Sequence, residues 1–384
     1  MKNLKLIRIT TVPLSLDKLL SGQLHYMNNF FEVVAVSSEK EYLERVGKKE
    51  GVRTFHLEMS RKITPIQDVV AVVKLVIFLR NEKPTIVHTH TPKAGIIGML
   101  AAKIANVPNR FHTVAGLPLL EIQGTKRRIL DLVEKLTYFC ATQVYPNSFG
   151  LKDIILKNNY CKESKLKVLA NGSSNGIDTD YFNPANFTIE ENKNLRKRLQ
   201  LAEDDFVFVF VGRIVADKGI NELISAFDSY NKMDSKAKLL LVGDYENELD
   251  PLHPGTLEVI NNNPAIVSVG FQSDVRPYLA ISNVLVFPSY REGFPNVVMQ
   301  AGAMGLPSIV SNINGCNEII IEGKNGMIIP VKDSKAIFDK MKFFHESVAS
   351  YQIQQSNSRI MISERFAQNV VWEALYNEYQ SVVK

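Results

Sequence analysis

Short, almost wholly apolar runs alternate with longer amphipathic segments along the whole chain. In the first half, the runs that predict buried strands are Leu4–Thr11, Glu32–Ser37, Thr85–Thr89, Arg110–Thr113, Gln143–Pro146 and Leu166–Leu169. In the second half, they are Phe206–Gly212, Ala237–Gly243, Ile266–Gly270, Val284–Pro288, Ser308–Val310 and Met327–Ile329. Apolar strands that alternate with helices are typical of parallel sheets covered on both faces. We therefore expect an α/β protein with two doubly wound domains that face each other.

Helical periodicity predicts helices over Ile66–Asn81, Gly95–Ala105 and Ile189–Leu199. The segment YFNPANFT (Tyr181–Thr188) interrupts the pattern, so we place the domain boundary there. This gives domains of residues 1–185 and 186–362. A final amphipathic stretch, Ser363–Val383, predicts one more helix. Its pattern fits a helix that caps the second domain. In a protein with two such domains, we expect residues 363–384 to cross back to the first domain.

Charge is divided unevenly between the two halves. The chain has 384 residues and a formal net charge of +5. Residues 1–185 hold 26 Lys and Arg against 16 Asp and Glu, a net charge of +10, so the rest of the chain carries −5. A basic half of the chain can bind nucleic acid, an anionic lipid surface or a phosphorylated substrate. Nucleic acid is disfavoured, because the basic residues are scattered and not interleaved with aromatic residues on one face.

The sequence contains no apolar run of the roughly 20 residues that cross a bilayer. The N-terminal MKNLKLIRITTV predicts a first strand and not a secretory signal. The three cysteines, Cys140, Cys161 and Cys316, form no CxxC pattern, which argues against a disulfide framework or a zinc site. We expect a cytoplasmic protein in a reducing compartment.

Two stretches at the ends of predicted strands could carry chemistry. The first, GRIVADKG (Gly212–Gly219), follows one strand and opens a helix, whose N-terminal amides attract anions. Gly212 lets the backbone approach a ligand, and Arg213 and Lys218 add two cations. The turn therefore predicts a diphosphate clamp, although a solvated basic turn fits the same spacing equally well.

The second stretch, FPSYREGFPNVVMQAGAMGLPSIV (Phe287–Val310), runs from strand to loop to helix to strand. Glu292 lies in the loop, where a carboxylate at a buried sheet edge is costly unless it contacts a ligand. The backbone amides of Asn296 and Val297 begin the helix and would reinforce an anion site, with Gln300 one turn further on. The alternative is that Glu292 is an ordinary helix N-terminal cap.

Other polar residues favour structural roles. His88 and His90 share one face of a strand but have no third ligand nearby in the sequence, so we expect no metal there. Asp178 and Asp180, near the domain boundary, are also interpreted as structural. Lys93, at a helix start, is better suited to an acceptor phosphate. The sequence has no GxGxxG, Walker loop, GxSxG or HExxH motif, which argues against an NAD enzyme, an NTPase, a serine hydrolase and a zinc peptidase.

With NGCNEIIIEGKNGMIIP (Asn314–Pro330), these stretches resemble the C-terminal half of the family 4 retaining nucleotide-sugar glycosyltransferases of the GT-B fold. The first half is similar to bacterial polysaccharide-assembly members in ITTVPLSLDKLLSGQ (Ile9–Gln23), IVHTHTPKAGIIGMLAA (Ile86–Ala102), GTKRRILDLVEKL (Gly124–Leu136) and NGSSNGIDTDYFNP (Asn171–Pro184). The resemblance covers essentially the whole chain. It implies two Rossmann-like domains, of which the first binds the acceptor and the second binds the donor.

The resemblance implies catalytic roles for Arg213 and Lys218 at the donor diphosphate and for Glu292 beside the donor sugar. The donor contacts that it implies fall on Gly212, Gly243, Val269, Phe271, Phe294, Pro295, Asn296, Val297 and Gln300. The acceptor contacts fall on Gly22, His90 and Lys93. We expect no metal or other cofactor.

Two positions depart from the family pattern. Gln300 stands where relatives usually have a second glutamate that holds the ribose, so we expect weaker or altered ribose binding. Many relatives have a histidine just before a glycine at a strand end, whereas here Ala115 precedes Gly116 and His112 lies further back on the strand. The loss is tolerable if the leaving diphosphate acts as the base toward the acceptor hydroxyl.

The resemblance implies a retaining transferase that moves a sugar from a nucleotide-diphosphate sugar, preferably a UDP-sugar, to a polyprenyl-diphosphate-linked saccharide in bacterial surface polysaccharide biosynthesis. An anionic membrane surface would then explain the basic first half better than nucleic acid does, with attachment at the inner face of the cell membrane. One alternative is a UDP-sugar 2-epimerase, which shares the architecture but lacks the GR…KG and EGFPN combination. Another is a non-catalytic sugar-nucleotide-binding assembly protein.

Overall fold

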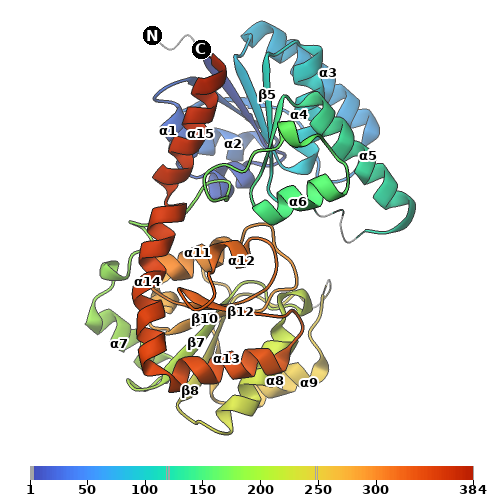
Figure 1. Ribbon diagram of the computed structural model, residues 1–384. Helices are drawn as coiled ribbons and strands as arrows, with labels where there is room; N and C mark the ends of the chain where they lie inside the picture. Colours follow the sequence, from blue (N-terminus) through green and yellow to red (C-terminus); the bar gives the residue numbers. More distant parts are fainter. Residues whose placement is uncertain (1–3, 118, 120–121, 247, 249, 384) are drawn as a thin grey trace. The chain divides into compact units, whose positions relative to one another are not determined.

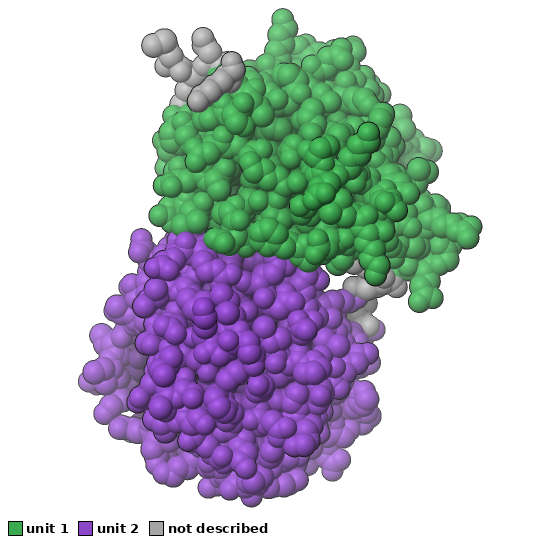
Figure 2. Space-filling model, in the orientation of Figure 1, with its two compact units in different colours: residues 1–176, 368–384 green, residues 177–367 purple. Residues whose placement is uncertain are grey.

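The computed structural model describes residues 4–117, 119, 122–246, 248 and 250–383 (Figure 1). The chain divides into two compact units, coloured separately in Figure 2. Unit 1 comprises Met1–Gly176 and Gln368–Lys384, and unit 2 comprises Ile177–Ala367. The division precedes the boundary that we expected after residue 185, because the backbone N–H of Ile177 already donates to the carbonyl of Phe366 in unit 2, over 2.8 Å.

Unit 1 is built on a parallel sheet with the order β3-β2-β1-β4-β5-β6. Its strands are β1 (Lys5–Ile9), β2 (Glu32–Ser37), β3 (Arg53–His56), β4 (Ile86–His90), β5 (Asn109–Val114) and β6 (Gln143–Pro146). Its helical elements are η1 (Ser15–Leu19), α1 (Gln23–Met27), α2 (Lys40–Glu50), α3 (Pro65–Glu82), α4 (Pro92–Ile104), α5 (Gly124–Cys140), α6 (Phe149–Lys157), η3 (Glu163–Lys165) and α15 (Gln368–Val383).

The C-terminal helix α15 completes one of the two faces of this sheet. Residues of α3, α4, α5 and α6 cover the other face. On the first face, Leu375 and Tyr379 of α15 share a core with Leu6 and Phe111 of the sheet and with η1, α1 and α2. The expected return of the last helix to the first domain is therefore confirmed, and the reason is that the sheet would otherwise expose apolar side chains.

Unit 2 repeats the plan with a parallel sheet of order β12-β11-β10-β7-β8-β9. Its strands are β7 (Phe206–Val211), β8 (Ala237–Val242), β9 (Ile266–Ser268), β10 (Val284–Phe287), β11 (Ser308–Ser311) and β12 (Gly326–Ile329). Its helical elements are η4 (Pro184–Asn186), α7 (Ile189–Arg198), η5 (Ala216–Lys218), α8 (Ile220–Asn231), α9 (Pro254–Asn262), α10 (Arg276–Ala280), α11 (Asn296–Ala303), α12 (Cys316–Ile319), α13 (Ser334–Glu346) and α14 (Val348–Phe366).

Three expectations about elements were wrong. The edge strand Arg53–His56 was missed, because its side chains are partly or fully exposed and carry no apolar run. Leu166–Leu169 is not a strand, since only an isolated bridge between Val144 and Leu166 forms there. Ser363–Val383 is not one helix, because the chain leaves helical geometry at Ala367 (ψ 147°) and starts α15 afresh.

Among the described helices, none is both long and apolar enough to span a bilayer. The three cysteines are free, with Cys140 and Cys316 buried.

Candidate active site

The candidate residues of unit 2 gather at the switch point of its sheet. Strands β7 and β10 are neighbours, and the strand order runs in opposite directions from this pair. The loops at the carboxyl ends of such a pair separate and leave a crevice, which is where open α/β sheets bind ligands. Arg213 and Lys218 follow β7, and Glu292 follows β10, so both predicted stretches flank this one point.

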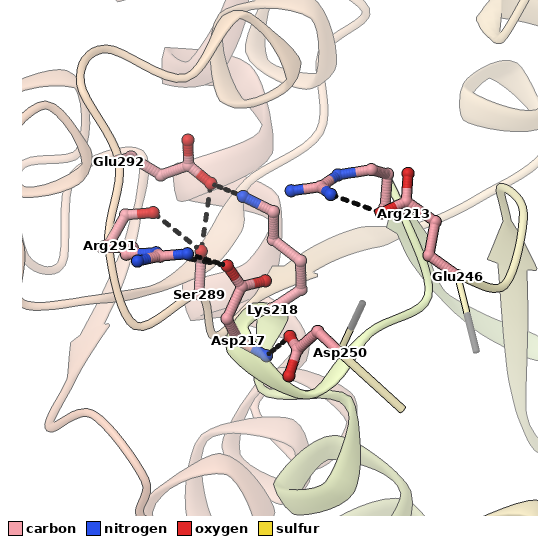
Figure 3. Close-up of polar contacts among 8 residues, drawn as sticks. All are labelled: Arg213, Asp217, Lys218, Glu246, Asp250, Ser289, Arg291 and Glu292. Carbon is pink, nitrogen blue, oxygen red and sulfur yellow. Dashed lines mark hydrogen bonds and ion pairs between the residues drawn. The ribbon is translucent and has the colours of Figure 1, made fainter. Parts of the chain in front are cut away.

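Lys218 and Glu292 meet across the switch point (Figure 3). Lys218 Nζ lies 2.6 Å from Glu292 Oε1, and their side chains are only 15% and 17% exposed. The hydroxyl of Ser289 donates to the same carboxylate oxygen over 3.0 Å. Two donors, Lys218 and Ser289, therefore orient the Glu292 carboxylate, which argues against its interpretation as an ordinary helix cap.

The loop that carries Lys218 is fixed by backbone contacts. The N–H of Asp217 donates to Asp250 Oδ2 over 2.7 Å, and the carbonyl of Asp217 accepts from the N–H of Tyr290 over 2.9 Å. Gly219 has a φ of +72°, and a Cβ there would lie 2.2 Å from the carbonyl oxygen of Pro288. Only glycine allows the loops after β7 and β10 to approach this closely.

Arg213 is the more exposed of the two predicted cations. Its Nη1 is 2.6 Å from Glu246 Oε2, and its side chain is half exposed, which leaves it accessible to a ligand (Figure 3). Gly243, at the end of β8, packs on the backbone of Gly212, where a Cβ would come within 1.8 Å of the Gly212 carbonyl oxygen. The strand ends thus form a smooth backbone surface beside the guanidinium.

The remaining donor candidates lie on two further segments. Val269 and Phe271 follow β9, and the Phe271 ring is largely exposed. Phe294 and Pro295 are buried, while Asn296, Val297 and Gln300 are exposed or partly exposed on α11. No side chain caps the N-terminus of α11 or of α8, and an uncapped helix N-terminus attracts anions.

Asn314 supports the loop from the far side of Glu292. Its side-chain amide donates to the carbonyl of Glu292 over 2.7 Å. Burial raises the pKa of the nearby Cys316 thiol well above its ordinary value, and the carboxylate of Glu292 adds to the shift. Cys316 is therefore a neutral wall of the site and not a nucleophile.

In unit 1, the acceptor candidate His90 is held by a buried arginine. Arg8 Nη2 lies 2.7 Å from His90 Nε2. Because a guanidinium can only donate, Nε2 accepts and the proton of the neutral ring is on Nδ1. Burial and the charge of Arg8 lower the pKa of His90 well below its usual range. His90 can thus donate to a ligand but cannot serve as a base through Nε2.

The other two acceptor candidates are engaged within unit 1. The N–H of Gly22 donates to Glu50 Oε1 over 2.9 Å, and the ring of Trp372 covers the same residue. Lys93 Nζ donates to both carboxylate oxygens of Asp68, over 2.6 and 2.8 Å. An anion that used Lys93 would therefore compete with Asp68.

Two further buried histidines, His88 and His112, have structural hydrogen-bond partners. His88 is fully buried and hydrogen-bonds Thr113 over 2.8 Å. His112 hydrogen-bonds Thr89 over 2.8 Å, and burial lowers its pKa to about 4. Within the described residues, no group of three or more His, Cys, Asp or Glu is placed to hold a metal ion.

Sequence reasoning missed several residues that build the site. Ser289 could have been found, since it lies in the same stretch three residues before Glu292. Asn314 opens another of the motifs, but its contact with Glu292 spans 22 positions. Glu246 and Asp250 carry no pattern that would mark them as partners of the loop after β7.

Two Rossmann-like units, of which the second gathers its polar residues at the switch point of its sheet, match the architecture of GT-B glycosyltransferases. Family models match both halves: "Glycosyl transferase 4-like domain" over residues 24–172 and "Glycosyl transferases group 1" over residues 191–361. The capsular polysaccharide biosynthesis glycosyltransferase CapM of Staphylococcus aureus is 34% identical, over 100% of this chain and 99% of its own length. The UDP-Gal:alpha-D-GlcNAc-diphosphoundecaprenol alpha-1,3-galactosyltransferase of Escherichia coli is 32% identical, over 80% of this chain and 78% of its own length. The chain belongs to this family of glycosyltransferases.

Solved structures agree on the fold. Anabaena Alr3699/HepE in complex with UDP superimposes with a TM-score of 0.82 at 18% identity, over 99% of this chain and 100% of that one. A UDP-N-acetylglucosamine 2-epimerase superimposes with a TM-score of 0.66 at 14% identity, over 100% of this chain and 98% of that one. Because a transferase and an epimerase share this fold, the choice between them comes from the family match, which favours the transferase.

Proposed function

We propose that this glycosyltransferase moves a sugar, with retention of anomeric configuration, from a nucleotide-diphosphate sugar to a polyprenyl-diphosphate-linked saccharide. The observation that carries the proposal is the ion pair of Lys218 and Glu292 at the switch point, between two uncapped helix N-termini. Lys218, Arg213 and the first-turn amides of α8 and α11 would stabilise the diphosphate, and Glu292 would contact the donor sugar.

In the proposed step, the acceptor hydroxyl oxygen forms a bond to the anomeric carbon on the face that the diphosphate leaves. The bond from that carbon to the diphosphate oxygen breaks, the diphosphate keeps the electron pair, and it takes the proton of the hydroxyl. No protein base is needed, which suits a chain with Ala115 before Gly116 and a tautomerically fixed His90. The two cations supply the stabilisation of the departing charge.

The donor and acceptor classes rest on similarity. One similar protein is named for a UDP-galactose donor and a diphosphoundecaprenol-linked acceptor, and another for capsular polysaccharide biosynthesis. We infer a UDP-sugar donor held by unit 2 and a lipid-linked saccharide acceptor bound by unit 1. We infer no metal or other cofactor, because two fixed cations and helix amides can neutralise a leaving diphosphate.

The acceptor class also implies a place in the cell. A polyprenyl-diphosphate lipid resides in a membrane, so we propose peripheral attachment to the anionic inner face of the cell membrane. The basic first half of the chain, with its net charge of +10, supports this. Binding to anionic vesicles should weaken as salt rises.

The test is a donor screen with the purified full chain. UDP- and GDP-sugars are mixed with extracted polyprenyl-diphosphate-linked saccharides, and nucleoside diphosphate release and the anomeric configuration of the product are measured. A UDP-sugar should release UDP and give retained configuration. Lys218→Ala and Glu292→Ala should each lower release by at least about 100-fold, since each removes a group placed at the reacting centre.

Lys232→Ala is the matched control, because Lys232 forms an exposed pair with Asp228 on α8, away from the switch point. It should leave the rate unchanged. Transfer that persists in both site variants would show that the site is elsewhere. Conversion of the UDP-sugar to its epimer without acceptor would identify an epimerase, and binding without turnover would identify an assembly protein.

A further inference from the structure

Helices α3 and α5 expose apolar side chains to solvent. On α3, the exposed apolar residues follow helical spacing and are Ile66, Val69, Val70, Val73 and Ile77. On α5, they are Ile129, Leu132, Leu136 and Phe139. A helix that buries one apolar stripe and exposes another is unusual on a surface that meets only water.

Three of these exposed residues, Val69, Val73 and Ile129, line a groove. Helix α4 lies between α3 and α5 and packs against both (Figure 1). The groove above α4 has a volume of about 440 Å³, within the range of ligand pockets. Its walls and floor are lined by Val69, Val73, Ile96, Leu100, Ile129 and Val133. A hydrocarbon chain would be the complementary occupant.

The groove lining also includes two cations, Arg61 and Lys93, and two carboxyl groups, Asp68 and Glu134. A lipid diphosphate that bound Lys93 would displace its partner Asp68, which lies 2.6 Å away. The segment 61–140 that forms these helices holds twelve Lys and Arg against five Asp and Glu, a net charge of +7. An apolar groove with two cations in its lining and a basic surround is complementary to a lipid that carries a diphosphate.

The groove adjoins a second pocket at the carboxyl ends of β4 and β5. Pro92 and Glu134 line both cavities, and Ala115 and Gly116 line the second one. The apolar groove therefore adjoins the carboxyl ends of β4 and β5, near the acceptor candidate Lys93.

We propose that the groove between α3, α4 and α5 binds the polyprenyl chain of the lipid acceptor and directs its diphosphate to Lys93 and Arg61. This inference rests on the proposed function for the identity of the lipid. The groove acts on the acceptor only: it raises affinity for long-chain acceptors and leaves the donor site unaffected.

The test compares two substitutions in the groove with two outside it. Val73→Asp and Ile129→Asp place a charge on facing walls, at side chains that are each 52% exposed, so folding should be preserved. The controls are Ile77→Asp, on the same helix but outside the groove and 57% exposed, and Ile189→Asp in unit 2, 77% exposed. Acceptors with a long polyprenyl chain and with a short water-soluble chain are compared in detergent.

We expect the groove variants to raise KM for the long-chain acceptor at least about 10-fold and to change kcat/KM for the short-chain acceptor less than twofold. The control variants should change both less than twofold. Equal losses with both acceptors, or equal losses in Ile77→Asp and Val73→Asp, would overturn the proposal.

Labelling with a photoreactive polyprenyl diphosphate, in the absence of donor, tests lipid binding in the groove independently of sugar transfer. It should label peptides of α3 and α5 in the wild type and in Ile77→Asp, and much less in Val73→Asp. Labelling elsewhere would overturn the inference. A change of oligomeric state in Val73→Asp with unchanged labelling would instead assign the groove to a protein interface.

Discussion

Lys218 Nζ and Glu292 Oε1 lie 2.6 Å apart although 74 positions separate the two residues in the chain. The pair joins the loops after β7 and β10, and both side chains are largely buried. Lys218→Met should therefore lower the free energy of unfolding by about 1–3 kcal/mol, because it leaves a carboxylate without its cation. Glu292→Gln should cost a similar amount.

Denaturant unfolding of the two single variants and the double variant measures the coupling. The double variant should be less destabilised than the sum of the single ones, since no unpaired charge remains. Additive effects would contradict a direct interaction between the two groups.

Gly219→Ala should strongly destabilise unit 2 and weaken donor binding. The new Cβ would lie 2.2 Å from the carbonyl oxygen of Pro288, and φ is +72°, so both a clash and backbone strain arise. We expect the free energy of unfolding, measured by thermal unfolding, to fall by about 3 kcal/mol or more, together with weaker UDP-sugar binding. Gly305→Ala is the control: its φ is +83° but no atom lies within 4 Å of the added Cβ, so it should cost only about 1 kcal/mol.

Gln300→Glu should tighten donor binding. Gln300 is partly exposed on α11, in the position where the family pattern has a glutamate for the ribose. A carboxylate accepts hydrogen bonds from both ribose hydroxyls, so KM for the UDP-sugar should fall about 3- to 10-fold. Gln300→Ala should raise it. An unchanged KM in both variants would place the ribose elsewhere.

Glu134 should make stability depend on pH. Burial raises its pKa to about 7 from an ordinary value of 4.5, so between these values the folded chain binds more protons than the unfolded chain. Stability therefore falls as pH rises from about 4.5 to 7. Because a tenfold change in proton affinity corresponds to about 1.4 kcal/mol, the full effect is about 3 kcal/mol.

Thermal unfolding of wild type and Glu134→Gln at pH 5, 6, 7 and 8 checks this. The difference between the two proteins isolates the carboxyl group, because the buried histidines are common to both. The thermal stability of Glu134→Gln relative to that of the wild type should increase as pH rises. A constant difference would show that Glu134 is ionised throughout.

Tyr379→Phe should destabilise unit 1. The hydroxyl accepts from Arg8 Nη1 over 2.8 Å and also hydrogen-bonds His88 Nδ1 over 2.5 Å, and all three side chains are buried. Loss of an acceptor for a buried cation should cost about 1.5–3 kcal/mol. Tyr376→Phe, one turn earlier, keeps the ring contact with Phe30 and should change stability by less than about 0.5 kcal/mol in the same calorimetric measurement.

The strand–helix pattern predicted most of the fold, because continuous apolar strands are specific to sheets covered on both faces. It failed where side chains carry no such pattern, as at the exposed edge strand Arg53–His56. It also could not predict that Arg8, a polar residue in an apolar strand, would be fully buried. Its hydroxyl partner Tyr379 is 371 positions away, and only the packing of α15 brings the two together.

The candidate site was predicted by residue type and position at strand ends, and Lys218 and Glu292 do lie together. The pairing itself was not predicted, since periodicity does not say which loops flank a switch point until the strand order is known. The same limit hid Asn314, whose amide holds the carbonyl of Glu292. Residue types indicate the chemistry, whereas topology decides which residues meet.

The position of α15 has a consequence for biosynthesis. The sheet face that Leu375 and Tyr379 cover cannot be completed until α15 has left the ribosome. Unit 2 is a continuous segment, Ile177–Ala367, and can fold earlier. At about 5–20 residues per second, the first sheet waits roughly 10–40 s with one face covered only in part, by η1, α1 and α2. During synthesis, the unit that begins first is the one that finishes last.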